Sequence, residues 1–183
     1  MAHGVRFHVV SPGGDRIHHV TEQDIRVVLS RLPVELWARL RAVHFNDRSM
    51  GARTLGYVTP SHREIALCAL PPRASLTGCC WLNGLAPQAF GAARGRQWPP
   101  LAIRRFLLYN VFLHELGHLQ MVDPEARSDR LKFAREKLAQ EFATQWCKAL
   151  WSEPFGHPDP VHNPPTHEEM EALERAANDR GTI

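Results

Sequence analysis

The sequence predicts an α+β domain in which a short, twisted, mixed sheet packs on two long helices. Apolar residues recur at three-to-four spacing over residues 101–121, which is typical of an amphipathic helix, and a second helical pattern follows at residues 124–151. Short β-branched or alternating stretches, typical of strands, occupy residues 5–10, 41–46, 54–59 and 64–70. With 183 residues, of which 44% are hydrophobic, the chain is long enough to form one domain, residues 1–183, around a hydrophobic core.

Capping and turn residues mark the ends of several of these elements. Thr21 is a good N-cap for a helix that ends near Leu32. A Pro-Ser-His turn at residues 60–62 separates the last two strands, which predicts a hairpin. Thr166, with Glu169 three residues later, forms a capping box at the start of a last helix.

The main functional signal lies near the end of the helix predicted at residues 101–121. His114 and His118 are four residues apart, so on a helix their imidazoles lie one turn apart on the same face and can bind one metal ion. Glu115 lies one step round the helix, where it can reach a metal-bound water rather than the metal itself. This HExxH spacing predicts a catalytic zinc site with two neutral imidazole ligands and with Glu115 as the general base.

A catalytic zinc usually has three protein ligands and one water, so a third ligand is expected after His118. Glu141 is the first candidate, because the second predicted helix places it beside apolar residues, where an unpaired carboxylate costs free energy. Asp129, eleven residues after His118, is the alternative, with a spacing that resembles the aspzincins. Asp123 is a further rival.

Together these residues make the chain resemble a small gluzincin-type zinc metallopeptidase with a zincin-like fold. Residues 140–145 resemble the gluzincin glutamate helix, with Gln145 in place of the Asp that orients a histidine ligand. Residues 162–166 are similar to the His-Pro segment of CAAX-prenyl-protease-like and heat-shock gluzincins. This likeness makes His162 a candidate catalytic residue that stabilises the oxyanion, and Tyr57 and Tyr109 are further candidates for the same role.

The resemblance implies a metalloendopeptidase that hydrolyses peptide bonds in a peptide or protein substrate. Zinc would polarise the carbonyl and acidify a water, and Glu115 would take the proton of that water and pass it to the leaving amine. In zincins the strand before the active helix usually forms the edge that binds an extended peptide through main-chain hydrogen bonds. Substrate binding is therefore expected along the strand at residues 64–70, from Glu64 onward.

Residues 71–100 are rich in Pro, Gly, Ala and Arg and predict a long loop of the kind that often forms a lid or a binding segment. Cys79 and Cys80 lie near its centre. A thiolate from either residue could bind the zinc and hold the enzyme latent. The alternative, which we prefer, is that both are small buried apolar side chains.

Composition and net charge limit the other classes of function that the sequence could have. The net charge of +3 does not by itself indicate binding to nucleic acid or to a membrane. No apolar run approaches the length of a transmembrane helix, and the N-terminus lacks the layout of a signal peptide, so we expect a cytoplasmic protein. The four cysteines match neither a zinc ribbon nor a disulfide scaffold.

Two other classes of function stay open. One is a regulatory or adaptor protein with the zincin fold and little or highly restricted proteolysis, similar to the ImmA/IrrE-type proteins that act on a repressor. The other is a DNA-linked protease similar to the SprT group. That group takes a third histidine ligand soon after the motif, and the loop that directly follows His118 contains no histidine.

Overall fold

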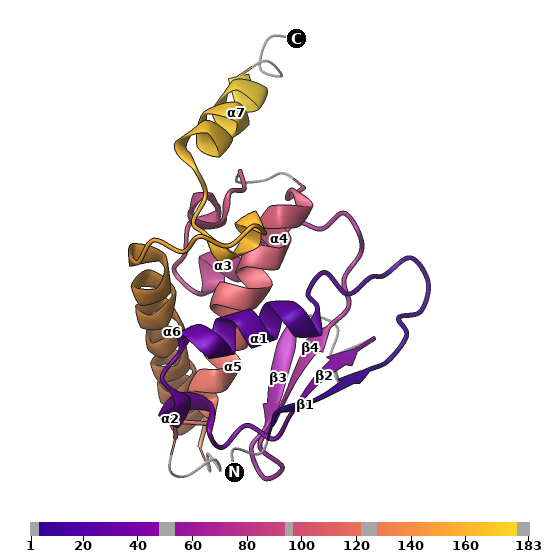
Figure 1. The fold of residues 1–183 in the computed structure, drawn as a ribbon, viewed down its shortest axis with the longest axis vertical. Helices are drawn as coiled ribbons and strands as arrows, with labels where there is room; N and C mark the ends of the chain where they lie inside the picture. Colours follow the sequence, from indigo (N-terminus) through magenta and orange to yellow (C-terminus); the bar gives the residue numbers. More distant parts are fainter. Residues whose placement is uncertain (1–3, 48–53, 94–96, 122–127, 179–183) are drawn as a thin grey trace.

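The computed structural model describes residues 4–47, 54–93, 97–121 and 128–178. Figure 1 shows a small sheet beside a group of helices. The strands are β1 (Arg6–Val9), β2 (Ala42–Asn46), β3 (Gly56–Thr59) and β4 (Glu64–Cys68), in the spatial order β1-β2-β4-β3. β1, β2 and β4 are parallel, and β3 is antiparallel to β4. The predicted α+β class, mixed sheet and hairpin are therefore confirmed.

One face of the sheet forms part of the hydrophobic core. Side chains of alternate residues in a strand point to the same face, and the buried ones on this face are Val43, Phe45, Ile65 and Leu67. Helix α1 (Glu22–Arg31) adds Ile25 and Val28 to the same core. It begins at the predicted cap, where Thr21 and Asp24 form a capping box. The short helix α2 (Val34–Trp37) then leads into β2.

The helix predicted at residues 101–121 forms in three consecutive segments. These are α4 (Pro100–Phe106), the π-helical η2 (Leu107–Phe112) and α5 (Leu113–His118). Every residue of η2 is buried, so this stretch is the central element of the core. Short π-helical segments are rare and are frequently found at functional sites, and this one directly precedes the two histidines.

The second long helix, α6 (Asp129–Ser152), lies alongside α5 (Figure 1). It is followed by the short 3-10 helix η3 (Pro160–His162) and by α7 (His167–Asn178), which projects from the body of the molecule. The predicted capping box at the start of α7 is confirmed, since Thr166 and Glu169 exchange both hydrogen bonds. No described helix is long and apolar enough to cross a membrane.

The prediction of one long loop at residues 71–100 is wrong in part. The segment contains the helix α3 (Thr77–Leu82) and the 3-10 helix η1 (Pro87–Phe90). Buried aromatic residues hold it on α4: the rings of Phe90 and Trp98 lie 5.0 and 5.5 Å from the ring of Phe106. These edge-to-face contacts order a segment whose Pro and Gly content alone predicts a loop.

Candidate metal centre

The two histidines of the HExxH motif meet as the helical spacing predicts. His114 and His118 lie on one face of α5, and their Nε2 atoms are 3.1 Å apart. Both side chains are mostly buried, with 14% and 15% of their surfaces exposed. Two ring nitrogens so close together require a proton or a cation between them, because two lone pairs facing each other repel.

The carboxylate that joins the histidines is Glu136, on α6. Its two oxygens lie 3.1 Å from His114 Nε2 and 3.4 Å from His118 Nε2. The three side chains form a cluster that could hold a metal ion. Ligands at about 2.0–2.1 Å from a tetrahedral zinc are about 3.3–3.4 Å apart from one another, so these three side chains fit the coordination of zinc.

A neighbour of Glu136 fixes the orientation of the first histidine. Gln140 lies one helical turn after Glu136, and its Oε1 accepts a hydrogen bond from His114 Nδ1 at 3.2 Å. The amide nitrogen of Gln140 points instead to Thr144. An amide oxygen only accepts hydrogen bonds, so in a neutral His114 the proton is on Nδ1. The lone pair of Nε2 then faces Glu136 and His118, as a metal ligand requires.

The electrostatics favour a positive charge in the cluster of His114, His118 and Glu136. Burial lowers the pKa of His114, but the hydrogen bond to Glu136 and the charges of the nearby carboxylates outweigh it, and the pKa is raised. Hydrogen bonds from both histidines hold the pKa of Glu136 far below its usual range. Burial raises the pKa of Glu115, against the opposing effect of the two histidines. Glu115 is thus a buried carboxylate beside the cluster, suited to accept a proton.

A close helix contact brings Glu136 to the histidines. Gly117 lies between the two histidines in the turn of α5 that faces α6. A Cβ at this position would lie 3.1 Å from Ala139 Cα and 3.2 Å from Ala139 O. The missing side chain allows the two helix backbones to approach, and Ala139, fully buried, is the facing residue. The sequence HELGH therefore supplies two of the three candidate ligands, and its glycine leaves the space in which α6 packs closely.

The prediction that Glu141 lies on the core side of α6 is wrong. Glu141 is exposed and its carboxylate lies 3.7 Å from Lys137 Nζ, so it is not part of the cluster. Five residues separate it from Glu136, which turns it about 140° around the helix. The rival Asp129 is the first residue of α6, and its side chain, like Asp123, lies outside the described part of the structure. The carboxylate brought to the histidines is the one at position 136.

The cavities around the cluster are open on both sides. One of about 460 Å³ lies between β3 and α6 and is lined by His114, Glu115 and His118 together with Tyr57 and others. A second, of about 560 Å³, is lined by His114 and Glu136 and by two apolar side chains, Leu82 and Phe133. These two are 77% and 75% exposed. His114 and Glu136 therefore line both cavities.

The expectation that residues 64–70 form the edge of the sheet is wrong. β4 is paired with β2 on one side and with β3 on the other, so its main-chain groups are already used. The edge strands of the described sheet are β1 and β3, and β3 lines the cavity that His114 and Glu115 share. A Cβ on Gly56 would lie 2.8 Å from Val111 Cγ1, which shows how closely β3 packs on the helix that carries the cluster.

His162 belongs to a different part of the molecule. Its ring is 1% exposed, its Nδ1 lies 3.0 Å from the Tyr109 hydroxyl, and its Nε2 lies 3.7 Å from Asp24. The three cavities that His114 lines do not include it. Burial lowers the pKa of His162 to about 4. The prediction that His162 lies at the metal centre is therefore wrong.

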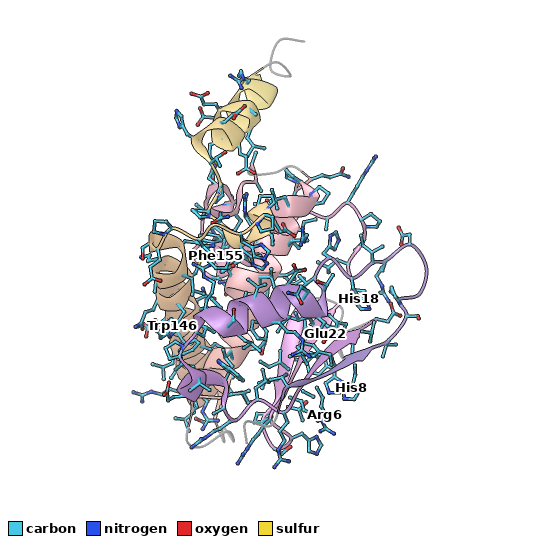
Figure 2. The ribbon with its side chains drawn as sticks, viewed as in Figure 1. Arg6, His8, His18, Glu22, Trp146 and Phe155 are labelled. Carbon is cyan, nitrogen blue, oxygen red and sulfur yellow. The ribbon has the colours of Figure 1, made fainter. Side chains whose placement is uncertain are left out.

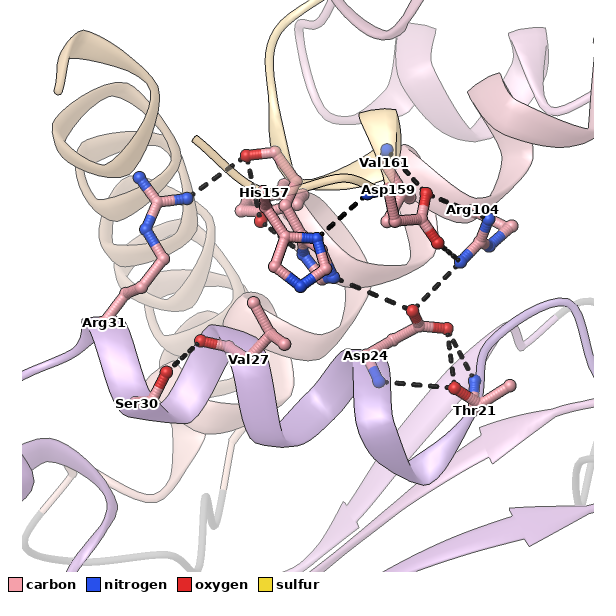
Figure 3. A network of polar contacts seen from close by, with 11 residues as sticks. Thr21, Asp24, Val27, Ser30, Arg31, Arg104, His157, Asp159 and Val161 are labelled. Atoms are coloured by element: carbon pink, nitrogen blue, oxygen red, sulfur yellow. Dashed lines mark hydrogen bonds and ion pairs between the residues drawn. The ribbon is translucent and has the colours of Figure 1, made fainter. Parts of the chain in front are cut away.

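Figure 3 shows the polar network around this buried region. Arg104 of α4 lies 2.9 Å from Asp24 of α1 and 2.7 Å from Asp159, which begins η3. Asp159 also accepts a hydrogen bond from the backbone of Val161 and caps η3. The backbone N–H of Asp159 donates to His157. The network ties the segment before α7 to the N-terminal helix, which is a structural role.

The other candidate side chains divide between the cavity and the core. Tyr57 lines the cavity with Glu115, and its hydroxyl accepts a hydrogen bond from Asn46 at 2.7 Å. Tyr109 is fully buried against His162, so it does not reach the cluster.

Cys80 is fully buried and packs in the core, as the apolar alternative predicts. Cys79 lines a cavity beside His114, but the metal-binding cluster of the described residues contains no thiol.

Comparison with family models, curated proteins and solved structures finds no match for this chain. The assignment of the site therefore rests on its geometry. Sequence reasoning missed Glu136 and Gln140, because other polar pairs on α6, such as Lys137 and Glu141, have the same spacing. Glu136 and Gln140 are four residues apart on a helix, the same spacing as the two histidines, so a pair of polar side chains on α6 faces a pair on α5.

Proposed function

We propose that this protein is a zinc-dependent metalloendopeptidase of the gluzincin type, with His114, His118 and Glu136 as the metal ligands. The observation that carries the proposal is the close approach of the three side chains: the two Nε2 atoms lie 3.1 Å apart, one oxygen of Glu136 lies 3.1 Å from His114 Nε2, and its other oxygen lies 3.4 Å from His118 Nε2. The three side chains come from two consecutive helices, α5 and α6. The hydrogen bond from His114 to Gln140 supports the proposal, because histidine ligands of metals usually donate their other ring N–H to a nearby acceptor.

The reaction is hydrolysis of a peptide bond. Bound zinc would supply a Lewis acid for the carbonyl and lower the pKa of a water to near neutrality. Glu115 accepts a proton from the attacking water and returns it to the leaving nitrogen as the C–N bond breaks. Glu115 is buried and lines the same cavity as both histidines, which favours this exchange.

The substrate binds as an extended chain along β3. Among the residues that the structure describes, β3 pairs with β4 alone, so along Gly56–Thr59 its other side offers main-chain donors and acceptors. An added strand there would use these groups, which is a common mode of peptide recognition. Lys132 and Arg135 of α6 also line the cavity beside β3.

Among the three candidates for oxyanion stabilisation, Tyr57 is the one that lines the cavity with Glu115. Asn46 donates to its hydroxyl, so the phenolic proton is available for another acceptor. Removing one such donor typically lowers kcat by about 10²–10³-fold. Tyr57→Phe tests this role, with retained zinc content as the requirement for a valid comparison.

Cleavage of an unstructured protein such as casein, measured with zinc-loaded wild type and with Glu115→Gln, tests the proposal. We expect turnover by wild type, inhibition by a metal chelator, and recovery on addition of zinc. Equal cleavage by wild type and Glu115→Gln would refute the mechanism. Zinc binding without any turnover in wild type would favour the adaptor alternative.

A further inference from the structure

A row of arginines marks the end of the sheet at which the parallel strands begin. β1 begins at Arg6, and Arg41 and Arg63 directly precede β2 and β4. Arg6 N–H donates to Arg41 O at 3.0 Å, and Arg41 N–H donates to Arg63 O at 2.9 Å. Because the three strands are parallel neighbours, these arginines lie side by side at the end of the sheet where the strands begin. Figure 2 labels Arg6 at this end of β1.

A fourth arginine completes a positively charged cavity. Arg39, in the segment between α2 and β2, lines a cavity of about 560 Å³ together with Arg6, Arg41 and Arg63. The remaining lining residues are Gly4, Ala38 and Leu40, so the lining contains no acidic and no aromatic residue. All four arginines are exposed. Within the described ranges, none of their guanidinium groups has an ion pair or a side-chain hydrogen bond.

Protein stability does not account for this arrangement. Like charges held close together repel, and the backbones of Arg41 and Arg63 are hydrogen-bonded neighbours. The nearest acid in the sequence, Glu64, lies 3.1 Å from His44 instead of pairing with an arginine. Arg63 also has a φ of 60°, a conformation that non-glycine residues rarely adopt and that is found preferentially at functional sites.

We propose that this arginine cavity binds a small molecule that carries two or more adjacent phosphate groups. The planar guanidinium group holds phosphate oxygens through paired N–H donors, and four of them can balance several negative charges. The cavity volume lies within the range of small-ligand sites. Proteins that bind single-stranded nucleic acids add aromatic side chains on which bases stack, and the lining has none. A compact phosphorylated ligand is therefore favoured over a nucleic acid.

The proposal is tested by calorimetric titration of the full-length, zinc-loaded protein with inorganic tripolyphosphate in 0.1 M salt. We expect saturable one-site binding, and at least a tenfold loss of affinity in the double variant Arg41→Ala/Arg63→Ala. The matched control is Arg73→Ala/Arg175→Ala, which removes the same charge from exposed positions elsewhere. Its dissociation constant should stay within about twofold of wild type. All these proteins keep the metal cluster, so any effect of tripolyphosphate on bound zinc is the same in each.

The single variant Arg39→Ala guards against misfolding, because Arg39 lies outside the strands. It should also weaken binding, with an unchanged unfolding temperature. Absence of binding at millimolar tripolyphosphate would overturn the proposal. So would equal loss of affinity in the two double variants, which would show attraction by net charge alone. Tighter binding of a fluorescent 20-nucleotide DNA than of tripolyphosphate, lost in Arg41→Ala/Arg63→Ala, would replace the small ligand by a nucleic acid.

Discussion

Gln140 holds His114 in place: its side-chain oxygen accepts the Nδ1–H of the imidazole at 3.2 Å. This contact spans 26 residues of sequence and joins α5 to α6. It leaves Nε2 of His114 facing Glu136 and His118, the other two members of the cluster. In the proposed metal centre, the same stretch of α6 would therefore provide one ligand and the group that orients another.

Gln140→Leu should lower the affinity for zinc by about 10–100-fold, the usual cost of removing a residue that orients a metal ligand. Competition with a chromogenic chelator measures the affinity directly. Gln145→Leu is the matched control, because Gln145 is an exposed residue of the same helix. Equal effects of the two substitutions would contradict the role given to Gln140.

Glu115→Gln should retain zinc and the fold but lose about 10²–10⁴-fold in peptidase turnover, because the amide cannot accept the proton of the attacking water. Zinc content is measured by atomic absorption and turnover by release of fluorescent peptide fragments. A variant that keeps wild-type turnover would place the base elsewhere.

Gly117→Val should destabilise the protein and weaken its metal centre. The added side chain meets the backbone of Ala139 at 3.1–3.2 Å, and overpacking of this kind typically costs about 1–3 kcal/mol. We expect a lower free energy of unfolding in urea and a lower zinc affinity, because α6 must move away from α5. Gly78→Val is the control, since a Cβ at Gly78 has nothing within 4 Å. Retention of both quantities in Gly117→Val would show that the close contact is dispensable.

His162 should make the stability depend on pH. Burial, with a smaller contribution from His157, lowers the pKa of His162 from 6.5 to about 4 in the folded state, although Asp24 and Asp159 act in the opposite direction. The unfolded chain binds a proton at about pH 6.5, so stability is full above that pH and is lost as the pH falls toward 4. Between pH 7.5 and 4.5 the loss from this group is about 2–3 kcal/mol.

Urea unfolding of metal-free protein at the two pH values measures this loss. Metal-free protein is used because zinc binding also depends on pH. His162→Gln removes the titrating ring and should reduce the difference between the two pH values by the same 2–3 kcal/mol. If the free energy of unfolding differs between the two pH values as much in the variant as in wild type, His162 is not the cause of the pH dependence.

The sequence was a good guide where a local pattern decides the structure. The cap at Thr21, the strands around the hairpin and the helix that carries His114 and His118 all follow from spacing and residue type, and each is found. The paired histidines need only one helix to meet, so their positions can be predicted from the sequence alone.

The third ligand could not be predicted in the same way, because the rotation of α6 about its axis is set by tertiary packing. Leu138, three residues before Glu141, suggests an apolar face that includes Glu141, but its side chain is largely exposed. The buried face instead carries the small residues Ala139 and Ala143. Small residues permit the close approach to Gly117, and this contact, which no periodicity reveals, turns position 136 toward the histidines.

The edge of the sheet was misassigned for a related reason. Chain order places residues 64–70 last before the active helix, but the hairpin inserts β4 between β2 and β3. The position of His162 was predicted wrongly because a His-Pro pattern in a loop does not determine where the histidine side chain packs in the folded protein. Its position depends on long-range partners, Asp24 and Tyr109, that are far away in the sequence.

The most direct test of the proposed metal centre is the zinc content of three purified proteins after dialysis against trace metal. We expect about one zinc per chain in wild type and in Glu141→Ala, and loss of the metal in Glu136→Ala, since two imidazoles alone make an incomplete site. Full zinc content in Glu136→Ala, or loss of zinc in Glu141→Ala alone, would contradict the proposed ligand set.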